Sequence, residues 1–282
     1  MKNNRIVGIL GLIIVLLVVS ACGGTPEEPE AETMAEEAVV EEPMEEEAGE
    51  EVEEEAEAEP KEDAEEPEEE VFGSEEGDLI FSGFSAEKID PAVSTDDEVL
   101  TVSGHVYSRL VEMVDGELVS GLAASWSVSD DGLTYEFILR PNAVFSDGTQ
   151  VTSDVILANF NRWFDPENPL HGDDSEAYVA WKANFAGFRG EVTEDEAPIS
   201  TFDGIEKVDD LVFLIHLNVP MENFVETITA PEFSILNPIL LASEGVDHAT
   251  INGSVVGTGE YELAAWDEKG LSLVFSDTYW GK

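Results

Sequence analysis

The alternation of hydrophobic and polar positions predicts the first elements of the folded part of the chain. The stretch DLIFSGFS predicts a strand, which is closed by a turn at Asp90-Pro91. Beyond this turn, apolar side chains recur at spacings of three and four residues, so one helix with a single buried face is predicted. The residues of this stripe are Val99, Val102, Val106, Leu110 and Met113.

Two runs of strand-forming residues come next, GLAASWSVS and LTYEFILR. They are joined by Asp130-Asp131-Gly132, a strong hairpin signal because Asp-Gly suits the positive φ of tight turns. In the second run, alternate residues share one face: Leu133, Tyr135, Phe137 and Leu139. A helix is then predicted to begin near Thr152 or Ser153 and to bury Ile156, Phe160 and Trp163.

The pattern weakens between residues 166 and 200, where aromatic residues are scattered through an acidic stretch, and a long loop is predicted there. After it, ISTFDGIEKVDDLVFLIHLNVP predicts two strands with a turn at Asp209-Asp210, and MENFVETIT predicts a short helix. GTGEYELAAW and GLSLVFSD predict a last hairpin around Lys269-Gly270. Hairpins mixed with helices indicate a mixed α/β (α+β) domain over residues 78–282.

The first 21 residues have a different character. A basic start with Lys2 and Arg5 precedes an apolar run from Ile6 to Val19, which is the layout of a secretory signal. An uncleaved membrane helix is the alternative, but the run is short for a span of about 20 residues. VSAC, which ends at Cys22, resembles the lipobox of bacterial lipoproteins, and Cys22 is the single cysteine. We therefore expect a lipoprotein signal peptide at residues 1–21 and a lipid on Cys22, which holds the protein to a membrane outside the cytoplasm.

Residues 22–77 are predicted to form a disordered acidic tether. The stretch from Thr25 to Asp78 carries nearly half of the 64 acidic residues, against one basic residue, Lys61. Its small apolar content does not offset the entropy cost of ordering, and like charges favour an extended chain. The formal net charge of the whole chain is −52, so we expect no nucleic-acid partner, because such a surface does not neutralise phosphates.

The residues that carry chemistry in enzymes are scattered. No histidine has a partner at the spacing of metal ligands, and the four are His105, His171, His216 and His248. His171 lies near Asp173 and Asp174, but an acidic loop contains such a combination by chance, so no metal site is predicted. The chain also lacks a Gly-x-Ser-x-Gly motif and a phosphate loop. We predict no catalytic residues and no cofactor, and hence a protein that is not an enzyme.

Several segments together resemble family 5 of the bacterial extracellular solute-binding proteins. LAASWSVSDDGLTYEFILRPNAVFSDGTQVTSDV is similar to the signature block of that family. IDPAVSTDDEV resembles its early Leu-Asp-Pro turn, and VDDLVFLIHLNVP resembles its paired strand and proline. VGTGEYELAAW and SDTYWGK resemble its Gly-Thr-Gly-Pro-Tyr loop and Asn-Pro-x-Tyr-Trp segment, although Glu260 replaces the proline and Ser276-Asp277 replaces Asn-Pro.

The resemblance implies a fold and a function. Members of the family serve ABC importers and bind peptides, nickel complexes or oligosaccharides between two lobes. Here it implies a periplasmic-binding-protein-like type II lobe with an inserted subdomain at about residues 105–200. We expect residues 78–282 to be the N-terminal part of a solute-binding domain, with the second lobe absent and the chain truncated. The implied partners are a peptide or other small solute and the permease and ATPase subunits of the importer.

The resemblance also implies ligand contacts at two places. Thr95, Asp96 and Asp97 form the loop after the Asp-Pro turn, which faces the cleft and offers backbone groups to an extended ligand. Tyr178 and Trp181 are candidates for aromatic walls of the cleft, with packing of the long loop as the alternative. For the whole chain, the alternative function is a membrane-tethered surface or adhesion protein without a role in transport.

Overall fold

The computed structural model describes residues 77–281, which belong to one compact unit. The strands are β1 (Leu79–Ser82), β2 (Val111–Val114), β3 (Glu117–Ser120), β4 (Ala123–Val128), β5 (Thr134–Leu139), β6 (Phe202–Lys207), β7 (Val212–Leu217), β8 (Tyr261–Asp267) and β9 (Gly270–Phe275). The α-helices are α1 (Asp97–Val106), α2 (Ser153–Phe164), α3 (Val179–Phe185), α4 (Phe224–Thr227) and α5 (Pro238–Glu244). None of these helices is long and apolar enough to cross a membrane. The predicted signal peptide, Cys22 and nearly all of the predicted tether lie outside the described residues.

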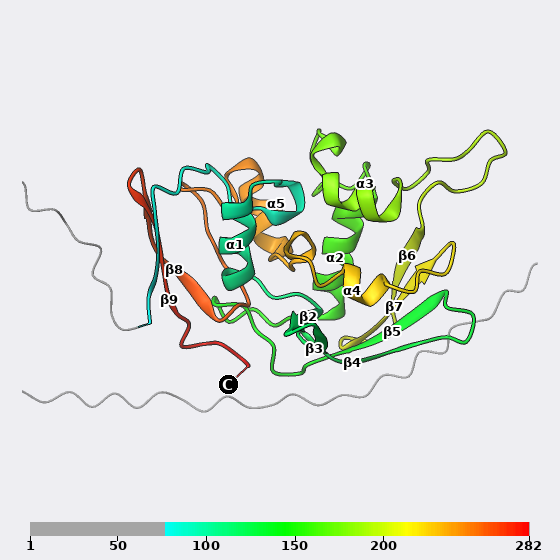
Figure 1. Ribbon diagram of the computed structural model, residues 1–282, viewed down its shortest axis with the longest axis horizontal. Coiled ribbons are helices and arrows are strands. Elements are labelled where there is room, and N and C mark those ends of the chain that lie inside the picture. The colour runs from blue at the N-terminus through cyan, green and yellow to red at the C-terminus, as the bar shows by residue number, and fades with distance from the viewer. Residues whose placement is uncertain (1–76, 282) are drawn as a thin grey trace, which may run out of the picture. The chain divides into compact units, whose positions relative to one another are not determined.

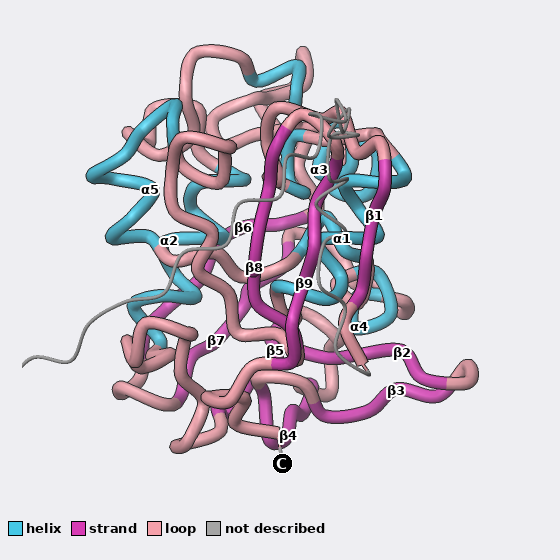
Figure 2. The backbone as a smooth tube through the Cα atoms, turned by 90° about the vertical axis from the view of Figure 1, so that its left-hand side faces the viewer, coloured by secondary structure: helices cyan, strands magenta, loops and turns pink. Residues whose placement is uncertain are grey.

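The strands form two larger sheets and a separate hairpin, and all neighbouring strands are antiparallel. One sheet has the order β1–β9–β8, and its three strands lie side by side in Figure 2. The other has the order β4–β5–β7–β6. In Figure 1, helices α1, α5 and α2 lie between the two sheets. Hairpins and helices are therefore mixed, as predicted, and β2 with β3 forms the separate hairpin.

The predicted hairpin of β4 and β5 forms because its connection satisfies its own polar groups. Asp131 accepts hydrogen bonds from the Ser129 hydroxyl at 2.6 Å and from the Leu133 amide at 3.1 Å. Gly132 adopts a φ of +72°, which glycine reaches without strain. Strand β5 then alternates between buried and exposed side chains, and the buried ones are Tyr135, Phe137 and Leu139.

The four-stranded sheet packs with α2 and α3 around an aromatic core, which we call the first core. Helix α2 contributes Phe160 and Trp163, whose ring centroids lie 4.8 Å apart. Phe202 of β6 lies 5.8 Å from the Phe160 ring and 5.1 Å from the ring of Trp181 in α3. Large rings bury much apolar surface in a small volume, so a few residues hold this sheet to its helices. The buried side of α2 is the predicted one.

Helix α1 packs on the three-stranded sheet around an aliphatic core, which we call the second core. Its valines Val99, Val102 and Val106 are buried in one cluster with Leu271 and Leu273 of β9. The buried residues of this core come from two distant stretches, 84–107 and 236–273. Almost all buried residues of the first core come instead from the stretch between them, 110–235.

The chain passes from the second core to the first and back at one place. The amide of Ile235 donates to the carbonyl oxygen of Ser108 at 3.0 Å, so residues 109–234 leave and return at neighbouring points. Ser108 is also fixed to Thr258, whose hydroxyl and carbonyl oxygens accept from the Ser108 amide at 3.0 Å and hydroxyl at 2.9 Å. Strands β6 and β7, which follow residue 200, belong to the same sheet as β4 and β5.

Helix α1 ends at Val106, so the predicted continuation of this helix to Leu110 and Met113 is wrong. Tyr107 is already extended, with φ −118° and ψ 141°. Strands β2 and β3 follow, joined by Asp115-Gly116 with φ values of +53° and +82°. Positive φ at both central residues is what a type I′ hairpin turn requires. The Asp-Gly turn outweighs the helical spacing here.

The predicted long loop at residues 166–200 contains a helix, α3, and this part of the prediction is also wrong. The aromatic residues of the stretch follow one another at spacings of three and four, which is the period of a helix face. All four are buried: Tyr178, Trp181, Phe185 and Phe188. Helix α3 ends where Ala186 turns to a φ of +68°.

Candidate functional site

The loop that is predicted to contact a ligand lies at the start of α1. Thr95, Asp96 and Asp97 are exposed. Asp96 is the N-cap of α1, and its carboxylate accepts from the amides of Glu98 at 2.8 Å and Val99 at 3.4 Å. These bonds satisfy amides that the first helical turn leaves free. The side chain of Asp96 is therefore used by the fold, and Thr95 and the Asp97 carboxylate are the groups that this loop presents to solvent.

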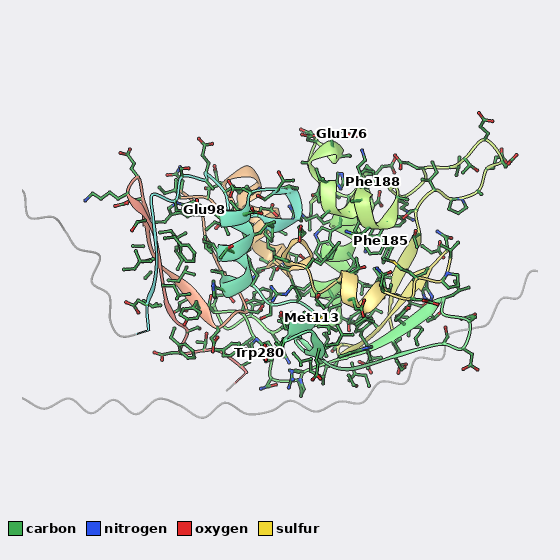
Figure 3. All side chains as sticks on the ribbon, viewed as in Figure 1. Glu98, Met113, Glu176, Phe185, Phe188 and Trp280 are labelled. Carbon is green, nitrogen blue, oxygen red and sulfur yellow. The ribbon has the colours of Figure 1, made fainter. Side chains whose placement is uncertain are left out.

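The two predicted aromatic walls lie in the first core. Tyr178 and Trp181 are each 1% exposed. The Tyr178 hydroxyl donates to the His171 carbonyl at 2.8 Å, and the Trp181 indole donates to the Gly187 carbonyl at 3.0 Å. Their neighbours on the same stretch, Phe185 and Phe188, are labelled in Figure 3. This burial favours the packing alternative for both rings, since a wall of the cleft would have to be uncovered first.

A cavity of about 340 Å³ lies beside the predicted loop, and we call it the Lys88 cavity. Its size falls within the range of about 300–1,000 Å³ that is usual for small-molecule sites. Val93, two residues before Thr95, forms part of its wall. The other apolar lining residues are Pro169, Leu170, Ala177 and Leu241. The cavity thus combines aliphatic walls with the charged side chains of Lys88, Asp90 and Arg162.

A buried ion pair contributes to the lining of this cavity. Arg162 Nη2 lies 2.5 Å from Asp90 Oδ2, and Lys88 Nζ approaches the same oxygen at 3.3 Å. Burial raises the pKa of Asp90, but the positive charges of Arg162 and Lys88 outweigh it, so this pKa lies below its usual value. Burial lowers the pKa of Arg162, but the Asp90 carboxylate raises it above its usual value. Both groups therefore stay charged.

Arg162 connects three segments that are distant in sequence. It belongs to α2, it pairs with Asp90, and its Nε donates to the Leu170 carbonyl at 3.1 Å. Its guanidinium carbon lies 5.7 Å from the Tyr178 ring, which stacks on His171 at 4.2 Å. Burial raises the pKa of Tyr178 to about 12, so the phenol stays neutral. Arg162 thereby contacts several segments near the cavity at once.

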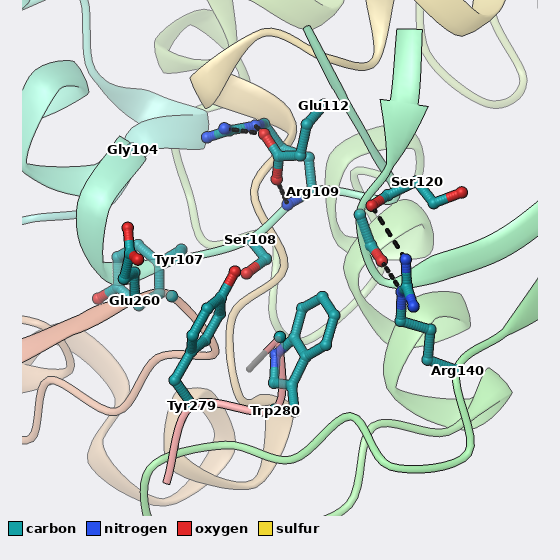
Figure 4. Close-up of a pocket in the computed structure, with 13 residues that line it drawn as sticks. Gly104, Tyr107, Ser108, Arg109, Glu112, Ser120, Arg140, Glu260, Tyr279 and Trp280 are labelled. Atoms are coloured by element: carbon teal, nitrogen blue, oxygen red, sulfur yellow. Dashed lines mark hydrogen bonds and ion pairs between the residues drawn. The ribbon is translucent and has the colours of Figure 1, made fainter. Parts of the chain in front are cut away.

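A second cavity, of about 270 Å³, lies where the chain crosses between the cores (Figure 4). Arg109 is paired with Glu112 through its amide and its guanidinium. Arg140 donates to the Gly121 carbonyl at 2.8 Å and lies over the Trp280 ring at 5.5 Å. Both arginines therefore have partners within the protein, as Lys88 and Arg162 do in the Lys88 cavity.

Two of the four histidines have hydrogen-bond partners at their ring nitrogens. His171 Nδ1 lies 2.6 Å from the Arg162 carbonyl oxygen, and its Nε2 lies 2.8 Å from the Ser175 hydroxyl. His216 is half-buried in β7, with Nδ1 3.3 Å from the Thr134 hydroxyl. Within residues 77–281, no group of three or more His, Cys, Asp or Glu side chains is placed to hold a metal ion.

The sequence prediction missed Lys88 and Arg162 and treated Asp90 only as a turn residue. One signal pointed to Arg162: it lies directly before Trp163, within a helix whose apolar residues are buried. A charged residue among buried positions needs a partner of opposite charge. Nothing local identifies Asp90 as that partner, because it lies 72 residues earlier.

A comparison with known families identifies the fold. The family described as "Bacterial extracellular solute-binding proteins, family 5 Middle" matches residues 117–282. The chain belongs to this family. The matched residues include α2 with Arg162 and the strands from β3 to β9.

The curated relatives of this family 5 protein bind several kinds of solute. The glutathione-binding protein GsiB of Pectobacterium atrosepticum is 29% identical over 191 residues, 67% of this chain and 32% of that protein. The probable D,D-dipeptide-binding periplasmic protein DdpA of Escherichia coli is 28% identical over 208 residues, 70% of this chain and 35% of that protein. The chain spans about one third of the length of these relatives.

Solved structures give the same fold. The periplasmic binding protein DppA from Helicobacter pylori, in complex with the peptide STSA, matches with a TM-score of 0.59 and 25% identity. The match covers 70% of this chain and 38% of that one. HbpA2 from Haemophilus parasuis matches with a TM-score of 0.58 and 28% identity, over 70% of this chain and 39% of that one. The chain therefore has the predicted periplasmic-binding-protein fold and corresponds to somewhat more than a third of it.

Proposed function

We propose that this protein is the substrate-binding component of an ABC importer. It captures a peptide or a similar small solute outside the cell and delivers it to a membrane permease that works with an ATPase. The family match over residues 117–282 is the observation that carries the proposal. Relatives named for binding glutathione and a D,D-dipeptide, and a structural neighbour in complex with a peptide, favour a short peptide as the solute.

The site we propose for the solute joins the exposed loop to the Lys88 cavity. Thr95 and Asp97 are open to solvent at the start of α1, and Val93 of the same segment lines the cavity. An extended peptide that lies along this segment would form hydrogen bonds with its backbone groups and would place one of its side chains in the cavity. Backbone pairing tolerates many sequences, and a pocket then selects among side chains. This division suits an importer of short peptides.

Calorimetry and thermal denaturation of the full chain with pooled di- to pentapeptides test this function. A ligand present at 100 times its Kd should raise the free energy of unfolding by about 2.7 kcal/mol. We expect at least one pool to bind saturably and to raise the Tm. The alternative, a surface or adhesion protein, predicts that no pool changes the Tm, and that result would contradict the proposal.

A pair of variants locates the binding. Thr95→Trp places a bulky ring on the exposed loop before α1. It should lower the affinity for the peptide pool that binds the wild type most tightly. Thr193→Trp is the matched control, because Thr193 is an exposed threonine in a different loop, at residues 190–199. Equal effects of the two substitutions would show that the loop at Thr95 does not take part.

We also propose that Cys22 carries a lipid and that the acidic residues after it tether the binding unit to the membrane. Stable anchoring needs more than one acyl chain, which lipoprotein processing supplies. In a bacterial host, the wild type should incorporate labelled palmitate and sediment with membranes, and Cys22→Ser should lose the label. A wild-type protein without label would refute this anchor while leaving the importer function to the peptide test.

A further inference from the structure

His248 is a fully buried titratable side chain that the proposed site does not use. Its exposed fraction is 0%, and neither ring nitrogen has a hydrogen-bond partner among residues 77–281. Its Nδ1 lies 3.6 Å from Glu244 Oε2, beyond the reach of a hydrogen bond. Buried polar groups almost always have such partners, and each group that lacks one costs free energy. The folded state therefore holds this ring without the bonds that water would offer it.

The segment that carries His248, residues 245–254, follows α5 and contains backbone strain. Ala249 adopts a φ of +55°, which a residue with a side chain rarely does. A short antiparallel contact joins the segment to residues 88–89: the Ile89 amide donates to the Ala249 carbonyl at 2.7 Å, and Lys88 and Thr250 form an isolated bridge. A short contact that holds a strained segment can open while the rest of the chain stays folded.

The same segment forms part of the wall of the Lys88 cavity. Gly245, its first residue, lines the cavity together with Leu241 of α5. Lys88, which pairs with Thr250 in the bridge, lines it as well. Opening of the contact between residues 88–89 and 245–254 would therefore separate parts of this wall.

Four charged groups act on the His248 ring. Glu244 belongs to α5, Arg162 belongs to α2, and Lys88 and Asp90 lie in the segment before α1. Asp90 is already paired with both cations, so Glu244 is the anion left to balance a proton on the ring. Burial lowers the pKa of His248, and the two carboxylates do not restore it to its ordinary value of 6.5. The buried site therefore favours the neutral ring.

We propose that His248 is a pH-sensitive latch of the Lys88 cavity. Protonation of its ring releases residues 245–254 from residues 88–89 and opens this side of the cavity to solvent. The neutral ring stays in place, because burial costs a neutral imidazole less than a charged one. The charged ring gains water and moves away from Lys88 and Arg162 when the segment opens. This inference goes beyond the proposed function, since it concerns the cavity with or without a solute.

Proton linkage sets the direction and the size of the effect. The folded-state pKa of His248 lies below 6.5, whereas the open segment exposes a ring with the ordinary pKa. Opening therefore takes up a proton as the pH falls below 6.5. The equilibrium constant for opening should rise by up to about tenfold for each pH unit, until the pH reaches the folded-state pKa. The latch is thus closed at pH 7 and loosened near pH 5.

Native-state hydrogen exchange of the full chain tests the latch without any solute. The reporters are the amides of Ile89 and Ser254, which donate to the Ala249 carbonyl and to the Glu244 carboxylate. The bonds from Ser254 hold the pKa of Glu244 below its usual value, so this carboxylate stays charged between pH 7 and pH 5. Over that range, after correction for intrinsic exchange rates, the protection factors of both reporters should fall about tenfold or more.

The amides of β5 and β7 serve as the internal reference, because they belong to the other sheet. Their protection factors should change less than about twofold over the same range. Unchanged protection at Ile89 and Ser254 would overturn the proposal. An equal loss of protection in β5 and β7 would also overturn it, since the chain would then be unfolding as a whole.

A pair of variants assigns the effect to the ring. His248→Gln does not take up a proton in this range, so Ile89 should keep the same protection at pH 7 and pH 5. His216→Gln is the matched control, since His216 is half-buried in β7 beside the Thr134 hydroxyl, and it should keep the pH dependence of the wild type. A pH dependence that survives His248→Gln would belong to another group and would refute the latch.

A titration of the wild type keeps the test independent of whether His248→Gln folds. In proton NMR, the His248 ring should titrate with the same midpoint, below pH 6.5, as the loss of protection in residues 245–254. A ring that titrates while the segment stays protected would show proton binding without opening, which contradicts the latch. No solute is present in these measurements, so failure of the latch leaves the peptide test of the proposed function unaffected.

Discussion

The two cores differ in their side chains and in the way the chain builds them. The first core is dominated by aromatic rings and comes almost entirely from one stretch, residues 110–235. The second core is mainly aliphatic and joins residues 84–107 to residues 236–273. Contacts that close short loops cost less entropy than contacts that close long ones. The first core can therefore form with fewer contacts to the rest of the chain. The second core forms only when the two ends of the unit come together.

A buried ion pair links the segments that belong to the two cores. Asp90 follows Ile89 of the second core, and Arg162 precedes Trp163 of the first. Buried pairs gain little net stability because both charges lose water. Their geometry is demanding, however, so this pair restricts how the Asp90 segment and α2 can be oriented.

The largest effect is expected from the first core. Trp163→Ala removes a side chain that is 1% exposed and should lower the free energy of unfolding by about 3–5 kcal/mol. Trp266→Ala is the matched change beside the second core, where the ring is only partly buried, and should cost clearly less. Chemical denaturation measures both. Equal losses of the free energy of unfolding would mean that the first core does not contribute more to stability than the second.

The ion pair that links the cores should show an effect of similar size. Arg162→Met leaves the Asp90 carboxylate buried without its main partner, which typically costs about 3–5 kcal/mol. Combining it with Asp90→Asn removes the stranded charge and should recover part of the loss. A double-mutant cycle on the free energy of unfolding gives the coupling. Additive losses would show that the pair does not couple the two segments.

A change in the second core should act locally. Leu273→Ala removes a fully buried side chain of β9 and should cost about 3 kcal/mol. Hydrogen exchange should then accelerate in β1, β8 and β9 while the amides of β5 and β7 keep their protection. Leu139→Ala in β5 is the control from the first core. If either variant accelerates exchange equally in both sheets, the cores unfold as one unit.

The smallest effect is expected from pH. His248 is fully buried, and burial lowers its pKa, although the carboxylates of Asp90 and Glu244 act in the opposite direction; Lys88 and Arg162 lower it further. In the unfolded chain the pKa of this histidine is 6.5, so as the pH falls the unfolded state binds a proton before the folded state does. The free energy of unfolding should therefore fall as the pH drops through that value. His248→Leu should flatten this dependence between about pH 7 and 5. An unchanged slope would assign it to the other histidines, two of which also have lowered pKa values.

Local patterns were sufficient for most of the fold. The hairpins β4–β5, β6–β7 and β8–β9 carry turn residues between alternating runs, and α2 has one clear apolar face. The two errors came from competing signals. An Asp-Gly turn interrupts the apparent helical stripe after Val106, and acidic neighbours obscure the helical spacing of Tyr178 and Trp181.

The candidate site was less accessible to sequence reasoning. Exposure of Thr95 and Asp97 follows from the loop before a capped helix, which local sequence specifies. The Lys88 cavity, in contrast, depends on segments around residues 90, 162, 170 and 241. Their meeting is set by the packing of whole elements. For the same reason, the sequence identified Tyr178 and Trp181 as aromatic candidates but did not decide whether they line a ligand site or lie in the core.

The single hydrogen bond between Ser108 and Ile235 has a consequence for how this protein can change over evolution. Because both ends of residues 109–234 sit at one point, that stretch is attached to the remaining frame like a cassette. Another stretch with equally close ends could take its place while α1 and the three-stranded sheet stayed where they are. One frame could thus carry cassettes of different size and chemistry, and each exchange would offer new solutes a different surface.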